Sequence, residues 1–121
     1  MTRSFKSKSL EMFFNPEKLM VYDIFEDDNG LALVIRNNTE TVLEGVSLEL
    51  TLPKDIVAYI NDNDDIRDKY TETFILPLKG EKVVYVFLSN ESDNDSTELM
   101  KVKVCVGNES VEGEVILHVL T

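Results

Sequence analysis

The sequence predicts an all-β protein, an immunoglobulin-like antiparallel β-sandwich of seven to eight strands. Short apolar runs alternate with polar turns along most of the 121 residues. No run has the helical period of about 3.6 residues. The clearest run, residues 46–52, alternates apolar and polar side chains, as a half-buried strand does, and Pro53 ends it because proline cannot donate to a strand ladder. Two sheets packed face to face bury such one-sided strands.

The first expected strand covers residues 18–26. The dipeptide Asn29-Gly30 follows it, and between two apolar runs this is the strongest short hairpin signal, since both residues tolerate a positive φ. We therefore expect residues 18–26 to pair with the aliphatic strand at 31–36. The polar residues 37–41 then reverse the chain before the strand at 46–52.

The rest of the chain continues this pattern. Apolar runs between turn residues predict further strands at 56–60, 70–76, 82–88, 99–106 and 111–120. The run 82–88 is apolar on both faces, which is typical of a central strand covered on two sides. The last two strands are expected to form a hairpin through Gly107. The segments 61–69 and 90–96 are too polar for the core and are expected to be loops.

We expect one domain with a lead-in: residues 18–121 form the sandwich, and residues 1–17 a basic, flexible N-terminal arm. Residues 1–18 contain four basic and two acidic residues, whereas the remainder contains 8 basic and 21 acidic ones. A body this acidic repels phosphates, which excludes nucleic acid as a partner. No apolar run is long enough to cross a bilayer or form a signal peptide, and the single Cys105 suits a reducing compartment. These features predict a cytoplasmic protein without integral membrane contact.

The strand at 111–120 carries the candidate partner-binding residues. One of its faces is aliphatic and turned to the core, while the other bears Ile116, His118 and Leu120. An outer face this apolar indicates that something covers it. The candidates are a protein or peptide partner, a second copy of the chain in a homodimer, and the N-terminal arm.

The acidic loops offer an alternative function, a calcium-dependent binding or adhesion domain. The loops at 37–42, 61–69 and 90–97 are expected to meet at one pole, where their carboxylates would converge as a calcium site requires. The residues that match EF-hand ligand positions are Asn61, Asn63, Asp65 and Glu72. Ile66 stands where an EF-hand loop has its turn glycine, and acidic loops that are simply solvated are the competing interpretation.

Catalytic patterns are absent from the sequence. The only histidine, His118, has no Ser, Cys or metal-ligand spacing around it, and neither a glycine-rich phosphate loop, a CxxC pair nor a nucleophile elbow is present. We therefore expect a protein that is not an enzyme and needs no cofactor, with calcium as the only alternative.

Residues 22–53 resemble the immunoglobulin-like subdomain in the appendage, or ear, of vesicle-coat subunits, the adaptins and particularly coatomer gamma. The likeness rests on Tyr22-Asp23 and Phe25, the turn at Asn29-Gly30, the pair Asn38-Thr39, and the run from Leu43 to the alternating strand that ends at Pro53. Residues 73–87 resemble the strand, turn and strand before the closing hairpin of that family. The same order of a strand, an asparagine turn, an alternating strand and a proline also occurs in immunoglobulin-like modules of archaeal and bacterial surface proteins.

The appendage resemblance implies a non-enzymatic module that recruits or assembles partner proteins by binding short peptides, in a coat or trafficking-like complex. Two departures limit what it implies. Larger appendages continue into a platform subdomain, whereas this sequence stops at Thr121. Ears made only of the sandwich take acidic peptides on a basic patch, whereas this body is acidic. The resemblance therefore implies no ligand type and no site residue.

Overall fold

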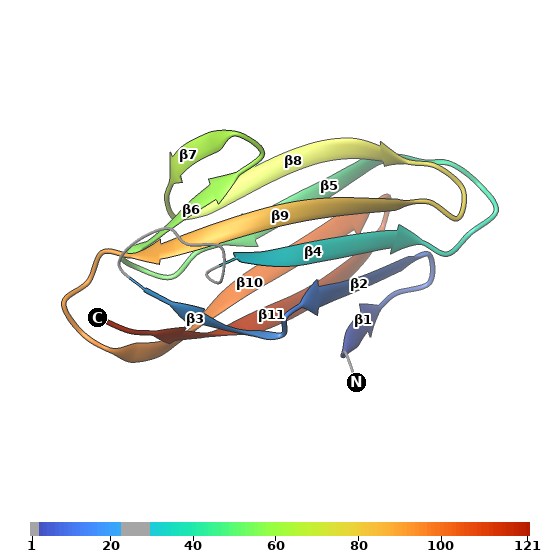
Figure 1. Ribbon diagram of the computed structural model, residues 1–121. Coiled ribbons are helices and arrows are strands. Elements are labelled where there is room, and N and C mark those ends of the chain that lie inside the picture. The colour runs from blue at the N-terminus through green and yellow to red at the C-terminus, as the bar shows by residue number, and fades with distance from the viewer. Residues whose placement is uncertain (1–2, 23–29) are drawn as a thin grey trace.

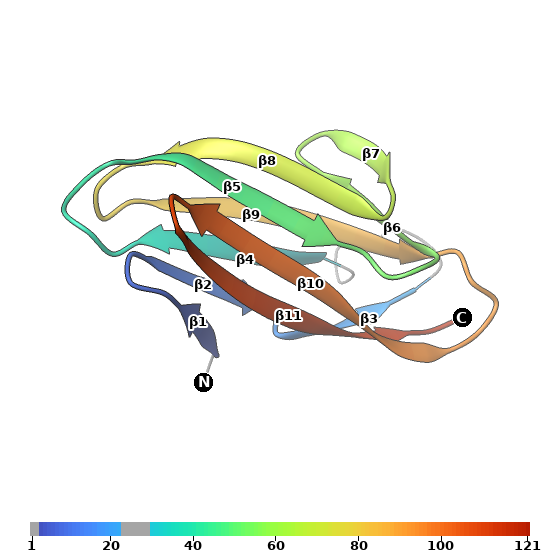
Figure 2. The same ribbon diagram turned by 180° about the vertical axis from the view of Figure 1, so that it is seen from behind.

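The computed structural model describes residues 3–22 and 30–121. These residues form strands β1 to β11 in two sheets that pack face to face (Figures 1 and 2). The described ranges contain no helix, and so none that is long and apolar enough to span a bilayer. The predicted all-β, immunoglobulin-like sandwich is confirmed, although the described residues form eleven strands and not seven to eight.

The first sheet has six strands, and all neighbours in it are antiparallel. Its strands are, in spatial order, β1 (Ser4–Lys6), β2 (Leu10–Asn15), β4 (Gly30–Asn37), β9 (Glu81–Asn90), β6 (Ile56–Ile60) and β7 (Asn63–Ile66). The strand β9 lies between β4 and β6, as expected of a central strand. Its outer face is open, however, because Tyr85 on that face is 61% exposed.

The second sheet has five strands. Their spatial order is β3 (Lys18–Val21), β11 (Glu109–Val119), β10 (Ser96–Val106), β5 (Leu43–Thr51) and β8 (Lys69–Leu76). All pairs are antiparallel except β3 with β11, which run parallel. The predicted closing hairpin of β10 and β11 is confirmed, and Gly107 in its turn has a φ of 57°, a conformation that glycine adopts without strain.

The core lies between the sheets and follows from alternation along the strands. In β10, Met100, Val102 and Val104 are at most 1% exposed, whereas Lys101 and Lys103 face the solvent. The inward residues of β5 and β11 are buried in the same way, as predicted. Each fully buried aliphatic side chain stabilises the fold by about 1.5–3 kcal/mol relative to leaving it in water.

The prediction of a flexible arm over residues 1–17 is wrong for the described residues 3–17. Leu10, Met12 and Phe14 are at most 1% exposed, and they alternate with outward-facing neighbours as strand residues do. The ring of Phe5 packs so closely on β11 that a Cβ on Gly113 would lie 2.8 Å from it. These apolar residues bury more surface in the sandwich than a free arm could. Their period of two is hard to recognise in the sequence because Phe13, which points outward between Met12 and Phe14, is apolar as well.

The predicted pairing of residues 18–26 with residues 31–36 is wrong for residues 18–21. These residues form β3, which pairs with β11 in the five-stranded sheet, while β4 pairs with β2 and β9. Pro16, directly after β2, ends that ladder and lets the chain cross to the other sheet. Of the predicted turn, Asn29 falls outside the described residues, as do residues 23–28.

The segment 61–69 is not a loop throughout. Its residues Asn63–Ile66 form β7, which returns along β6 as a short hairpin at the end of the six-stranded sheet. Asn61 and Asp62 have positive φ values of 50° and 66°, which Asn and Asp tolerate better than most residues. The hairpin therefore follows from turn chemistry and not from an apolar run.

Candidate functional site

The residues predicted to bind a partner lie on one apolar surface of the five-stranded sheet. We call it the β11 patch; it consists of Met20, Leu99, Ile116, His118 and Leu120. On the outer face Ile116 stands beside Leu99 of β10, and His118 beside Met20 of β3. Met20 and Leu99 are 47% and 42% exposed, while the three residues named by the sequence are half-buried. Met20 and Leu99 were missed because their contribution depends on which strands flank β11.

Charged pairs border the β11 patch on the same face. Glu114 stands opposite Lys101, and Glu112 opposite Lys103, with 3.8 Å between the Lys103 Nζ and a Glu112 carboxylate oxygen. Both signs alternate here, so the acidity of the chain is not concentrated on this sheet. The patch is therefore largely apolar, with Lys18 beside Ile116 and Thr97 beside His118 on the same face, and it has charged pairs of both signs at its border.

The predicted single acidic pole is only partly correct. Asn37 ends β4 and Asn90 ends β9, and because these neighbouring strands are antiparallel, the loops that follow them lie at opposite ends of the sandwich. The loop at 37–42, with Glu40, is therefore separated from the loops at 61–69 and 90–97. Figure 1 shows the first loop at the end where β4 and β5 are joined, and the other two at the far end.

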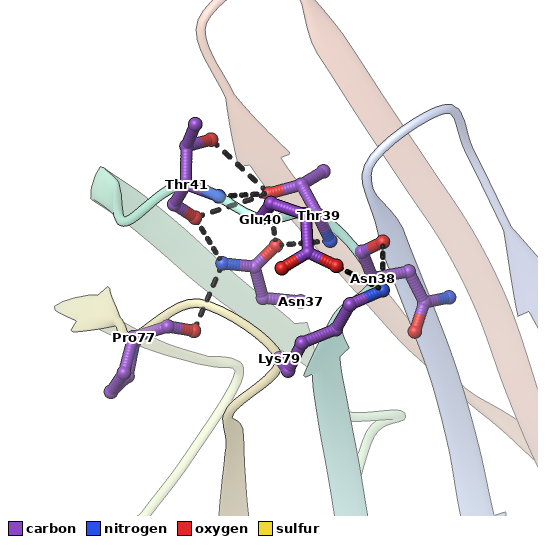
Figure 3. A network of polar contacts seen from close by, with 7 residues as sticks. All are labelled: Asn37, Asn38, Thr39, Glu40, Thr41, Pro77 and Lys79. Atoms are coloured by element: carbon purple, nitrogen blue, oxygen red, sulfur yellow. Dashed lines mark hydrogen bonds and ion pairs between the residues drawn. The ribbon is translucent and has the colours of Figure 1, made fainter.

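The loop after β4 is organised by the side chain of Asn37, which is fully buried (Figure 3). Its Nδ2 donates to the carbonyl oxygens of Thr41 at 2.8 Å and Pro77 at 3.0 Å, and its Oδ1 accepts from the Thr39 amide at 2.9 Å. Lys79 pairs with Glu40 at 3.4 Å. This network is satisfied internally, which indicates a structural role.

The opposite end, which we call the acidic pole, comprises residues 53–55, 61–68 and 91–95. These loops contact one another: the Leu52 amide donates to the Asp68 carbonyl, and the Glu91 amide to the Asp55 carbonyl. The pole holds eight acidic and two basic residues. Arg67 lies between Asp65 at 2.8 Å and Glu91 at 2.9 Å. Its hydrogen bond holds the pKa of the Glu91 carboxyl below the ordinary range, while Glu91 and Asp65 raise the pKa of Arg67.

The four candidate calcium ligands do not come together as a set. Glu72 accepts from Asn61 Nδ2 at 2.9 Å, but the same carboxylate accepts from the Tyr70 hydroxyl at 2.8 Å and pairs with Lys82 at 3.1 Å. The Asp65 carboxylate lies on Arg67, and the Asn63 side chain donates to the Asn61 carbonyl. Within residues 3–22 and 30–121 no three His, Cys, Asp or Glu side chains are grouped to hold a metal ion.

No protein-family model matches the sequence, and no curated protein is similar to it at a significant level. Solved structures with a similar fold exist. A family 123 glycoside hydrolase from Clostridium perfringens superposes with a TM-score of 0.56 at 7% identity, over 86% of this chain and 22% of the hydrolase. This chain thus spans about a fifth of that enzyme, and the likeness describes the sandwich fold.

Two smaller proteins are also similar. The GAE domain of GGA2p from Saccharomyces cerevisiae has a TM-score of 0.46 and 12% identity, over 98% of this chain and 96% of that domain. WR4, an MSP family member from C. elegans, has a TM-score of 0.47 and 6% identity, over 91% and 96%.

Proposed function

We propose that the protein is a non-enzymatic interaction module that recruits or assembles partner proteins through the β11 patch. The observation that carries the proposal is the apolar strip on the outer face of the five-stranded sheet, where Met20 and Leu99 are nearly half exposed beside Ile116 and His118. A solvated sheet face normally alternates with polar residues outward, as β11 itself does at Glu112 and Glu114. A contiguous apolar area on such a face marks a docking site.

The surroundings of the patch fit a protein interface. A standard interface covers about 800 Å² on each partner, more than the patch alone provides, so a partner also covers the charged pairs around it. Lys101 and Glu114 then form the polar rim that surrounds an apolar interface centre. Because this rim carries both signs, a second copy of the chain also fits it, which makes a homodimer the competing occupant.

The resemblance of residues 22–53 to coat appendages supports recruitment as the role, in a cytoplasmic complex of coat or trafficking type. In this proposal the protein acts by binding and does no chemistry.

The test compares two pairs of exposed apolar residues. In the patch variant, Met20→Glu and Leu99→Glu place charges on the β11 patch; in the control, Val42→Glu and Leu78→Glu do so at the opposite end, where those residues are 49% and 51% exposed. Light scattering over a range of concentrations reports self-association, and capture from an extract of cells that express the protein reports other partners. Circular dichroism verifies that both variants fold.

The proposal predicts that a dimer or a captured partner is lost in the patch variant and kept in the control. A protein that stays monomeric and captures nothing contradicts it. So does a partner that both variants retain, or that both variants lose.

A further inference from the structure

The outer face of the six-stranded sheet carries a cluster of aromatic side chains, far from the β11 patch in the sandwich. We call it the aromatic face; it consists of Tyr59 on β6 and Tyr85 and Phe87 on β9. Tyr59 stands opposite Phe87, with their ring centroids 6.4 Å apart in an edge-to-face arrangement. Tyr85 is two residues from Phe87 on the same side of β9 and is 61% exposed. Tyr59 and Phe87 are half-buried, so part of each side chain reaches the surface beside the exposed Tyr85.

Two carboxylates border this face. The Tyr59 hydroxyl donates to Asp62 at 3.3 Å, and the charges of Asp62 and Asp64, together with partial burial, raise the pKa of that hydroxyl. In the described ranges no Lys or Arg forms an ion pair with either carboxylate. The sequence between residues 22 and 30 contains no basic residue that could do so. Among the described residues, neither carboxylate beside the rings is therefore paired with a cationic side chain.

On the outer face of the same sheet, at the opposite end, the chain's own Arg36 is held by an aromatic ring and carboxylates. The guanidinium carbon of Arg36 lies 5.3 Å from the ring centroid of Phe13, while its nitrogens pair with Glu81 at 3.2 Å and Glu11 at 3.7 Å. An aromatic ring and two carboxylates thus surround one cation supplied by the chain. The aromatic face with Asp62 and Asp64 offers the same groups without the cation.

We infer that the aromatic face docks a basic segment of a partner protein, with an Arg or Lys of that segment lying over Tyr85 or Tyr59 and pairing with Asp62 or Asp64. Cation–π contact and a carboxylate partner reinforce one another at such a site. The net charge of -11 draws a basic segment toward the protein and repels acidic ones. This surface lies on a different sheet from the β11 patch, so an experiment can disprove binding at one surface without affecting the proposal for the other.

The test uses a ten-residue Gly-Ser peptide that contains three arginines, and the same peptide with citrulline in place of arginine. An NMR titration maps the contacts and gives the affinity, at low salt and at physiological ionic strength. We expect the arginine peptide to shift the resonances of β6 and β9 and the citrulline peptide to have no effect. Tyr85→Ala should weaken binding about two- to fivefold. Asp62→Asn combined with Asp64→Asn should weaken it about two- to tenfold.

The matched control, Glu40→Gln combined with Glu112→Gln, removes the same charge from distant sites and should change the affinity less than about twofold. Equal losses in the control and in the Asp62/Asp64 variant overturn the inference, because they show general attraction to an acidic body. Equal binding of the citrulline peptide also overturns it. So does binding of an uncharged hexasaccharide, or of a second copy of the chain, at the aromatic face without binding of the arginine peptide there.

Discussion

Asn37 and Asn90 end two neighbouring strands at opposite poles of the sandwich, and both bend the chain in the same way. The Oδ1 of Asn37 accepts from the amide and hydroxyl of Thr39, and the Oδ1 of Asn90 accepts from the amide and hydroxyl of Ser92. Each Nδ2 donates to a carbonyl far away in sequence, that of Pro77 in one case and Leu120 in the other. Both side chains are at most 2% exposed.

The two poles differ in charge although both contain this arrangement of asparagine hydrogen bonds. The loops around Asn37, residues 7–9, 38–42, 77–80 and 107–108, hold two basic residues and one acidic residue, whereas the acidic pole holds eight acidic and two basic ones. The same Asn-x-Ser/Thr pattern is thus a means of ending a strand and says nothing about the loop's electrostatics. Asn-x-Ser/Thr is also the acceptor motif for N-glycosylation. The hydrogen bonds of the two Nδ2 groups argue against glycans on Asn37 and Asn90, since these nitrogens already donate inside the fold.

Replacing each of the two asparagines with alanine is expected to give the largest difference between the poles, measured as the loss in free energy of unfolding. Asn37→Ala should lower the free energy of unfolding by about 2–3 kcal/mol, because several partly buried groups around this fully buried side chain lose their hydrogen bonds at once. Asn90→Ala should cost about 1–2 kcal/mol, since its Nδ2 bonds are longer, at 3.2 and 3.4 Å. Urea denaturation measures both differences.

The controls for this pair are exposed asparagines next to each site. Asn38→Ala and Asn94→Ala should each change the stability by less than about 0.5 kcal/mol. If Asn90→Ala lowers the free energy of unfolding as much as Asn37→Ala, or more, then the hydrogen-bond distances do not explain how much each asparagine contributes to stability.

The sequence predicted the sandwich and most of its strands because alternation is a local property. The inward faces of β5, β10 and β11 follow from residues two apart, and the structure buries them as expected. The pairing of β3 was not predictable in the same way. It depends on competition between distant strands for the edge of β11, and a hairpin signal at Asn29-Gly30 carries no information about that competition.

The site was predictable only in its local part. The outward direction of Ile116 and His118 follows from the alternation of β11, but Met20 and Leu99 join them only through strand order. The aromatic face was missed because Tyr85 and Phe87 were interpreted as buried residues of a strand covered on both sides. The exposed Tyr85 shows that the six-stranded sheet is covered on one side. An apolar run on both faces of a strand indicates either a second cover or a docking surface, and sequence alone does not distinguish them.

A smaller effect is expected from Glu109, which anchors the loop of residues 7–9 at the Asn37 pole. Its carboxylate accepts from the Ser7 hydroxyl and from the Ser9 amide, the latter at 2.8 Å, and these bonds hold its pKa below the ordinary value of 4.5. A lowered pKa contributes stability that is present above pH 4.5 and is lost as the pH falls through the folded-state pKa. Glu109→Gln should therefore cost about 1 kcal/mol at neutral pH and little in acid.

Urea denaturation between neutral pH and about pH 3 measures the difference for Glu109. Glu112→Gln on the same strand is the control, because Glu112 is exposed and its only described ion pair, with Lys103, is long. A Glu109→Gln deficit that stays constant over the whole pH range would show that the glutamate acts through its shape and not through its charge.

The smallest effect is expected from calcium at the acidic pole, which holds eight acidic residues although no three carboxylates among the described residues are grouped to hold a metal ion. To bind through Glu72 on the neighbouring strand β8, the ion must displace Lys82, and to use Asp65 it must displace Arg67. Both exchanges replace an ion pair already formed, so calcium should leave the melting temperature unchanged relative to chelator. A site filled at 100 times its dissociation constant would add about 2.7 kcal/mol. A rise that sodium chloride of equal ionic strength does not reproduce, and that Glu72→Gln abolishes, would instead establish the calcium-dependent alternative and give the acidic pole a function that the Asn37 pole lacks.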